Sequence, residues 1–290
     1  MPMHASIRRC QPLLGTFVEV TVAGAREESE LLALGNEAFA QIRRIDALLS
    51  FHRAGSELSK VNREAATSTQ RISDALREVL AEALWISALS DGLFDVCVAP
   101  SLVARGLLPD HGVVTSTGAS WRDIELDGNH LRFHRPLMID LGGIAKGYAV
   151  DCAMARMPAD VEACVNAGGD LRMNAWRRRS VAIRLPDSAS CGFVELAMRN
   201  AAVATSLGRA GDHLGLIIDP RDGHASRDNR SFSVFAASAM RADALTKIAC
   251  LEPDCAALMQ RAGAQAIAVD ACGTISGPGA QASTREVACA

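Results

Sequence analysis

The sequence predicts an α+β fold, with mixed or antiparallel sheets and packed helices. Two long stretches with apolar residues at helical spacing occur before residue 90, and a run of short strand-like segments follows residue 160. Helices and strands do not alternate regularly, which argues against a parallel α/β sheet. With 290 residues and 49% hydrophobic content, the chain can bury a sizeable core as one large domain or two closely packed ones.

The first predicted elements are a strand and two helices. Residues 15–23 alternate in polarity as a strand does, and residues 27–49 place apolar side chains three and four positions apart. Residues 72–89 predict a second amphipathic helix, with Ser73 as its N-cap and Trp85 in the core.

The rest of the chain predicts short strands and two more helices. Short strands separated by Gly-Asn and Thr-Gly turns are expected in residues 112–134, and a strand is expected to end at Ile139 before a helix over residues 145–157. A further helix begins near Ala242. We expect the folded body to span residues 11–275 and a flexible tail to occupy residues 278–290. The remaining strands are expected around Ala163, Val181, Phe193, Val203, Leu216 and Phe232.

Composition excludes several classes of partner. A net charge of -3 and a pI near 6.2 provide no long-range attraction for nucleic acid. No segment approaches the roughly 18 apolar residues of a membrane span. The nine cysteines are scattered singly, and no apolar segment precedes Cys10, so we expect a reduced cytoplasmic protein without a secretory signal.

The segment IDLGGIAKGYAVD, residues 139–151, is the most informative motif. Asp140 and Lys146 should flank a turn between a strand and a helix, and Gly142 and Gly143 allow the backbone to approach a ligand closely. A helix N-terminus offers N–H groups and partial positive charge to a phosphate, and a lysine adds a full charge. The alternative is a tight turn with a solvated lysine.

Further motifs, in a specific order, carry a resemblance to a known family. VNAGGDLR (165–172), IIDPRDGHA (217–225) and MRADALTK (240–247) follow the first motif, and LLGTFVEV (13–20), SFHRAGSELSKVN (50–62) and SDGLFDVCVAP (90–100) precede it. Together they resemble the ApbE family of FAD:protein FMN transferases.

That resemblance implies a fold of T-fold-like architecture and a flavin-transfer activity. It implies that FAD is bound and cleaved, and that FMN passes to a threonine or serine of a partner flavoprotein carrying a Ser/Thr-Gly-Ala-Thr-like site. AMP is the leaving group. Two alternatives are hydrolysis of FAD to FMN and AMP, and FAD binding without catalysis.

The resemblance also implies which residues contact FAD. His52 stands where many relatives have a tyrosine that stacks on the flavin, and imidazole is a smaller flat ring; the alternative is a histidine on a surface loop. Asp95 has the alternative of a helix or strand cap. The full implied set is Leu14, His52, Leu93, Phe94, Asp95, Asp140, Lys146 and Ile217.

The metal site departs from the family pattern. Relatives bind magnesium through a backbone oxygen at Gly143, through the aspartate that matches Asp243, and through a threonine that is Lys247 here. An ammonium about 4 Å from a divalent ion would repel it by roughly 8 kcal/mol at an effective dielectric of about 20. Lys247 could turn away and leave Thr246 to supply the oxygen, it could replace the metal as a fixed cation on the diphosphate, or the site could be inactive.

A second departure concerns catalysis. Relatives usually have a histidine where this chain has Leu216, and His213 could reach the site only if the strand bulges at Gly215. The resemblance therefore implies Asp243, Lys247 and His213 as catalytic candidates. For the general base the sequence offers Asp243, Asp219 or His213 without a means of choosing.

Overall fold

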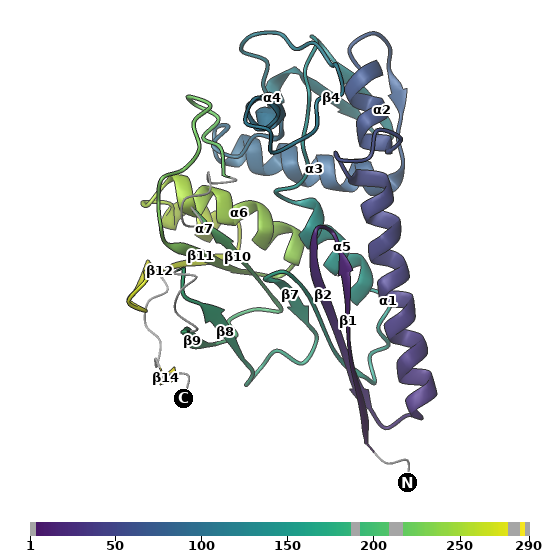
Figure 1. The fold of residues 1–290 in the computed structure, drawn as a ribbon, viewed down its shortest axis with the longest axis vertical. Helices are drawn as coiled ribbons and strands as arrows, with labels where there is room; N and C mark the ends of the chain where they lie inside the picture. Colours follow the sequence, from purple (N-terminus) through teal and green to yellow (C-terminus); the bar gives the residue numbers. More distant parts are fainter. Residues whose placement is uncertain (1–3, 187–191, 209–216, 278–284, 288–290) are drawn as a thin grey trace.

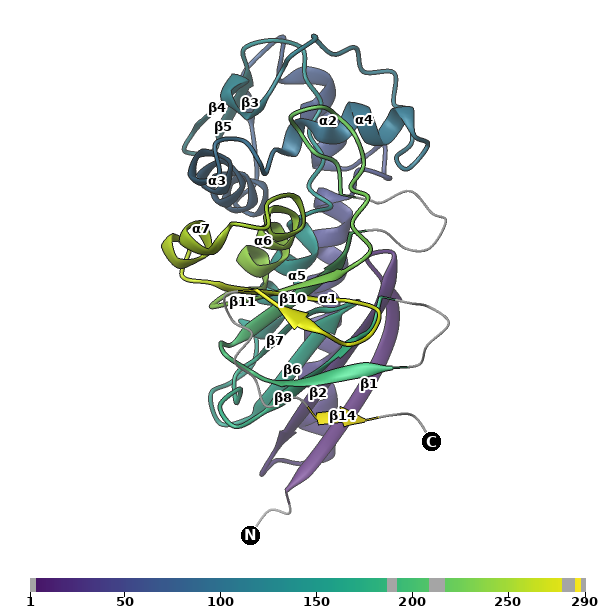
Figure 2. The same ribbon diagram turned by 90° about the vertical axis from the view of Figure 1, so that its left-hand side faces the viewer.

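The computed structural model describes residues 4–186, 192–208, 217–277 and 285–287 (Figure 1). An eight-stranded antiparallel sheet has helices on one face and a small three-stranded sheet on the other (Figure 2). The large sheet has the order β1 (Ala5–Leu13), β2 (Thr16–Gly24), β6 (Glu162–Ala167), β7 (Asp170–Met173), β10 (Ala202–Leu207), β11 (Ser231–Ala236), β12 (Gln265–Val269) and β13 (Ile275–Ser276). This arrangement agrees with the predicted α+β class.

The central strands are covered on both faces because their side chains point alternately to opposite sides. In β10, Ala202 and Ala204 face the helices, whereas Val203 faces the small sheet. In β11, Val234 faces the helices and Phe235 faces the small sheet. The small sheet consists of β8 (Ser180–Arg184), β9 (Phe193–Ala197) and β14 (Arg285–Val287).

Three helices form the layer over the large sheet. They are α1 (Glu28–Leu49), α5 (Ala145–Met154) and α6 (Ala239–Leu251), and α7 (Ala256–Arg261) follows α6. The predicted long helix is confirmed as α1, which begins at a capping box between Glu27 and Glu30 and buries an apolar face that includes Phe39. This layer contains both helices that carry the candidate site.

A second group of elements lies beyond the helical layer (Figure 1). Ser73 caps helix α3 (Asp74–Leu89) as predicted, because its hydroxyl accepts from the N–H of Leu76. The group contains α2 (Glu57–Glu64), β3 (Gln70–Arg71), α3 (Asp74–Leu89), the 3-10 turn η1 (Val96–Val98), α4 (Ala99–Ala104), the 3-10 turn η2 (Trp121–Asp123), β4 (Ile124–Asp127) and β5 (His130–Phe133).

Two predictions about apolar residues are wrong. Trp85 is 40% exposed rather than in the core, and the guanidinium of Arg241 lies 4.5 Å from its ring centroid. A cation over one face of the ring allows the indole to remain at the surface. The expected strand ending at Ile139 is also absent, although residues 137–139 are buried.

The side chain of Asn62 makes the two backbone hydrogen bonds at Ile139 that a neighbouring strand would otherwise make. Its Nδ2 donates to the carbonyl of Ile139 at 2.9 Å, and its Oδ1 accepts from the N–H of Ile139 at 2.9 Å. The N–H of Asp140 donates to the carbonyl of Val96. Buried backbone groups are therefore satisfied without a sheet, and the chain enters the glycine turn at a fixed position.

Two segments near the ends of predicted elements also differ from expectation. The residues after Leu216, which is outside the described part, form only an isolated bridge between Ile218 and Ala225 rather than a strand. Arg285–Val287 pairs with β9, so this part of the predicted flexible tail is a strand. Among the described residues, no helix has the length and apolarity needed to cross a membrane.

Replacing Asn62 with alanine should destabilise the fold markedly. Asn62 is 5% exposed, and its loss leaves two buried backbone groups of Ile139 unpaired. Each such group costs about 1–3 kcal/mol, so we expect the free energy of unfolding to fall by about 2–6 kcal/mol in urea denaturation.

Asn174 provides a matched control for this substitution. It makes the same paired contacts, to the N–H of Ala163 and the carbonyl of Val161, but it is exposed. Asn174→Ala should cost about 1 kcal/mol, because water can take over the contacts. Equal losses in the two variants would contradict the role given to Asn62.

Candidate functional site

Two adjoining cavities lie where the glycine turn meets α6. The larger has a volume of about 810 Å³ and the smaller about 60 Å³. Asp140, Gly143, Ile217 and Lys247 line both of them. A volume of this size is typical of small-molecule sites, which span about 300–1,000 Å³.

Every residue that the resemblance implies for FAD lines one of these cavities. Leu14, His52 and Lys146 line the larger one, and Asp140 and Ile217 line both. The smaller cavity is lined by the remaining three, which are Leu93, Phe94 and Asp95. Segments from five separate parts of the chain are therefore brought to one place.

Part of the wall of the larger cavity comes from a tight turn and a loop. Leu14 and Gly15 adopt φ values of 56° and 70° in the two-residue turn between β1 and β2. His52 lies in the loop that follows α1, and it is exposed. Its ring lies both at the surface and beside the cavity. The position is therefore compatible with a histidine that stacks on a ligand and with a histidine on a surface loop.

Asp95 has the geometry of a cap. Its carboxylate accepts from the N–H of Cys97 at 2.8 Å and from the N–H of Trp121 at 3.1 Å. Burial raises the pKa of Asp95, and these two N–H groups offset part of that shift. Both oxygens already have partners, so the residue holds the Leu93-Phe94 segment against η2 while it lines the smaller cavity.

Asp140 lies at the entry of the glycine turn. Its Oδ2 accepts from the N–H of Gly142 at 3.1 Å, and burial raises its pKa. A Cβ atom on Gly142 would lie 3.0 Å from that oxygen, and one on Gly143 would lie 3.2 Å from Cε of Lys247. The glycine pair therefore leaves space for a carboxylate on one side and a lysine on the other.

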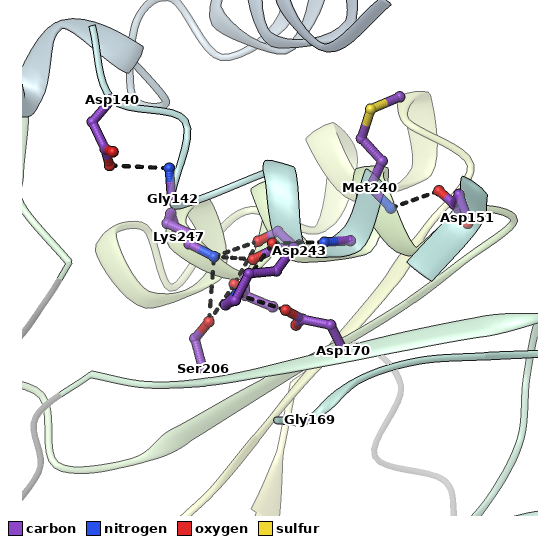
Figure 3. A network of polar contacts seen from close by, with 12 residues as sticks. Asp140, Gly142, Asp151, Gly169, Asp170, Ser206, Met240, Asp243 and Lys247 are labelled. Carbon is purple, nitrogen blue, oxygen red and sulfur yellow. Dashed lines mark hydrogen bonds and ion pairs between the residues drawn. The ribbon is translucent and has the colours of Figure 1, made fainter. Parts of the chain in front are cut away.

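Helices α5 and α6 cap each other (Figure 3). Asp151 of α5 accepts from the N–H groups of Ala239 and Met240 at the start of α6, each at 2.9 Å. Asp243 of α6 accepts from the N–H of Gly147 in the first turn of α5 at 3.2 Å. Carboxylates at helix N-termini satisfy free N–H groups and interact favourably with the helix dipole.

Four charged side chains form a buried cluster between these helices and β7. Nζ of Lys146 lies 2.6 Å from Oδ2 of Asp170 and 3.3 Å from Oδ2 of Asp243. Nζ of Lys247 contacts Oδ1 of Asp243 directly and lies 2.9 Å from its main-chain carbonyl oxygen. The carboxylates of Asp243 and Asp170 are 0% and 2% exposed, whereas Lys146 and Lys247 reach the cavity with 32% and 18% exposure.

Burial and charge act in opposite directions on the pKa values of this cluster. Burial and the charge of Asp243 raise the pKa of Asp170 to about 6, and the two lysines offset part of this shift. Burial would raise the pKa of Asp243 too, but the charges of Lys146 and Lys247 outweigh it and lower the pKa. Burial would lower the pKa of Lys146, and the two aspartates outweigh it and raise the pKa. The charged forms of Asp243 and Lys146 are therefore stabilised by their ion pairs rather than by water.

The expected phosphate site at the N-terminus of α5 needs a correction. The N–H groups at the helix N-terminus were expected to face a phosphate, but the N–H of Gly147 in this first turn donates to Asp243 of the protein itself. Lys146 lines the larger cavity as expected, and it is paired with two aspartates rather than solvated. The positive charge available to a ligand here comes from lysine side chains more than from the helix terminus.

The residues present do not fit a magnesium ion between Gly143 and Asp243. Lys247 does not turn away, since its ammonium contacts Asp243 and its Cε lies against Gly143. Thr246 is buried, and its hydroxyl bonds to the carbonyl of Asp243 at 2.7 Å and to Ser206 at 2.7 Å. Within the described residues, no group of three or more histidine, cysteine, aspartate or glutamate side chains could hold a metal.

The two described candidates for a general base, Asp219 and Asp243, already have partners for their carboxylate oxygens. Both carboxylate oxygens of Asp219 are bound by Arg221, which outweighs a smaller effect of burial and lowers the pKa of Asp219. Asp243 is fully buried, and both of its oxygens are engaged. His213 and Leu216 lie outside the described residues. Neither described aspartate is suited to accept a proton.

Sequence reasoning did not single out three polar residues at this site. Asp170 was part of the VNAGGD motif without a role, although an acid that follows a glycine pair was a usable signal. Thr205 and Ser206 line the larger cavity, and Ser206 bonds to Thr246. Leu207 also lines it and is 40% exposed.

Comparison with known sequences finds relatives along most of the chain. A family model described as ApbE family matches residues 14–282. The FAD:protein FMN transferase of Treponema pallidum is 26% identical, over 89% of this chain and 83% of the relative. The FAD:protein FMN transferase of Escherichia coli K12 is 26% identical, over 80% of this chain and 74% of the relative.

Solved structures share the fold. The apo form of the Pseudomonas stutzeri flavinyl transferase ApbE superimposes with a TM-score of 0.77 and 26% identity, over 98% of this chain and 94% of that one. The flavin transferase ApbE of Vibrio cholerae superimposes with a TM-score of 0.77, over 99% and 97% of the two chains, and its 23% identity supports the likeness in fold alone.

Replacing Gly147 with alanine should disrupt the mutual capping of α5 and α6. The new Cβ would lie 2.2 Å from the carbonyl oxygen of Ala239, so the two helices must separate. We expect thermal unfolding to show a loss of about 3 kcal/mol or more. Gly55→Ala, where no atom lies within 4 Å of the new Cβ, is the control and should change stability little. A fully stable Gly147→Ala variant would be inconsistent with this helix contact.

Proposed function

The chain belongs to the ApbE family, and on that premise we propose that this protein transfers the FMN half of FAD to a serine or threonine hydroxyl of a partner protein, releasing AMP. One observation carries the proposal. A cavity of about 810 Å³ connects the wall at Leu14 and His52 with two lysines that are held by buried aspartates. A flat apolar group and a phosphate could therefore be bound by different residues of one cavity.

The chemistry of the residues that line the cavity suggests how FAD would be oriented in it. The flavin ring would lie toward Leu14 and His52, and the diphosphate toward Lys146 and Lys247. Lysine is a compact point charge that binds phosphate without a fixed geometry, and both ammonium groups are oriented by carboxylates. Orientation before binding lowers the cost of stabilising charge in the transition state.

The proposed reaction is a phosphoryl-type transfer. The acceptor oxygen forms a bond to the phosphorus of the FMN half, and the bond from that phosphorus to the bridging oxygen breaks. The bridging oxygen leaves on AMP, and the hydroxyl proton passes to a base or to solvent. Because flavin is carried unchanged, the reaction needs neither oxidant nor reductant. Catalysis then depends on positioning and on neutralising the diphosphate.

The acceptor site and the location of the protein stay predictions. A Ser/Thr-Gly-Ala-Thr-like sequence is the acceptor that the family resemblance implies. The cytoplasmic location is the expectation drawn from the scattered cysteines.

Mass spectrometry tests the transfer directly. The protein should be incubated with FAD and a flavoprotein subunit that carries the acceptor sequence, in parallel samples with magnesium and with EDTA. We expect the acceptor to gain the mass of one FMN and the solution to gain an equal amount of AMP. An acceptor whose terminal threonine is replaced by valine should gain nothing. Free FMN and AMP in equal amounts, without any adduct, would instead identify a hydrolase.

Substitutions at His52 test the placement of the flavin. His52→Tyr should tighten FAD binding, and His52→Ala should weaken it, because a stacked aromatic pair contributes about 0.5–1.5 kcal/mol, or roughly two- to tenfold in Kd. Flavin fluorescence titration measures both changes. His130→Ala is the control, since His130 is exposed on β5 and lines neither cavity. Unchanged affinity in both His52 variants would place the flavin elsewhere.

A further inference from the structure

We propose that the ammonium group of Lys247 is the resident cation of this site, so that the FAD diphosphate is neutralised without a divalent metal ion. This inference rests on the proposed function and concerns the same cavity. The contacts that Lys247 makes differ from the pattern that the family resemblance implies, which is a metal-binding threonine at this position.

The position of Lys247 is that of a bound cation. Its Nζ contacts Oδ1 of Asp243, lies 2.9 Å from the carbonyl oxygen of Asp243 and lies 3.5 Å from Oγ of Ser206 (Figure 3). Its Cε lies against Gly143, and the residue lines both cavities. An ammonium group has three N–H donors. Two are well bound by Asp243, and the third, with only the long contact to Ser206, can turn to a phosphate oxygen.

The charges within the cluster of four side chains are balanced without an ion. Asp170 and Asp243 carry two negative charges, and Lys146 and Lys247 carry two positive charges within contact distance. Removing Lys247 would leave Asp243, which has no solvent exposure, with one shared ammonium and one N–H group. A divalent ion added to the complete cluster would instead leave it with excess positive charge next to an ammonium.

The oxygen ligands that a metal would need are also engaged. Magnesium requires near-octahedral coordination by oxygen. Oδ1 of Asp243 is bound by Lys247, and Oδ2 is bound by Gly147 and Lys146. Thr246 turns its hydroxyl to Ser206 and to the Asp243 carbonyl, and it does not line either cavity. Lys247 itself has no lone pair to offer.

A single ammonium in place of a divalent ion should also have a functional cost. One ammonium supplies a single positive charge where a divalent ion would supply two. With Lys247 in place, the two lysines and two aspartates of the cluster sum to zero charge. The charge that stabilises the departing AMP phosphate is correspondingly smaller. The bonds formed and broken are those of the proposed transfer, and no further reactant is needed.

The experiment combines metal binding with turnover. Binding of Mn²⁺ is measured by electron paramagnetic resonance, with and without FAD, for the wild type, Lys247→Thr and the control Lys60→Thr, which replaces an exposed lysine on α2. FMN transfer and FAD cleavage are measured in EDTA and in magnesium for the same proteins and for Lys247→Met. Circular dichroism and FAD titration check that each variant folds and binds its substrate.

We expect the wild type and Lys60→Thr to bind no stoichiometric Mn²⁺ and to react equally fast in EDTA and in magnesium. Lys247→Thr should gain one Mn²⁺ site, lose roughly 10²–10³-fold of its rate in EDTA, and match or exceed the wild type in magnesium. Lys247→Met should lose roughly 10²–10³-fold under both conditions.

Two results would overturn the inference. One is stoichiometric Mn²⁺ binding to the wild type, and the other is loss of wild-type turnover in EDTA that magnesium restores. Failure of the proposed function is distinct from both. A wild type that binds FAD but neither transfers nor cleaves it would end the transferase proposal, whereas the Mn²⁺ measurements on the wild type and Lys247→Thr would still decide which cation the site accepts.

Discussion

The carboxylate of Asp243 is the buried charge on which the site depends. It has no solvent exposure, so the protein itself must compensate it fully. Three groups do so: the N–H of Gly147 at the start of α5, the ammonium of Lys146, and the ammonium of Lys247. One side chain thereby fixes the distance between two helices and the directions of two lysines.

This constraint connects packing with chemistry. Helix α5 can approach α6 closely enough for the contact only because Gly147 has no side chain, and Asp151 completes the pairing by capping α6. Lys146 and Lys247 then reach the cavity from positions fixed by these contacts. The wall at Leu14 and His52, in contrast, consists of a hairpin turn and a loop. Lysines held by buried carboxylates suit a substrate whose reactive phosphates must be positioned precisely.

Much of the fold could be predicted because it depends on local patterns. Helix α1 follows from apolar residues spaced by three and four, and α3 begins at the N-cap that Ser73 predicts. The glycine pair and the lysine of the 139–151 segment indicated a turn at a ligand site, and the order of motifs indicated the family and the flavin chemistry. All eight residues expected near FAD line the two cavities, because they belong to motifs whose backbone positions the common fold preserves.

What the sequence by itself determined is therefore the set of elements and the segments that form the site, whereas the tertiary structure decided the partners of each side chain. Residues 137–139 looked like a strand, yet their neighbour is the side chain of Asn62, 77 positions away. Asp95 became a cap, and Trp85 stayed at the surface under Arg241. Above all, the sequence left open whether Lys247 turns away from Asp243 or binds it. That choice depends on Lys146 and Gly147, almost a hundred positions away, which approach Asp243 only when α5 and α6 pack. Local sequence patterns record propensity and spacing, but they contain no information about which distant charge will share a buried site.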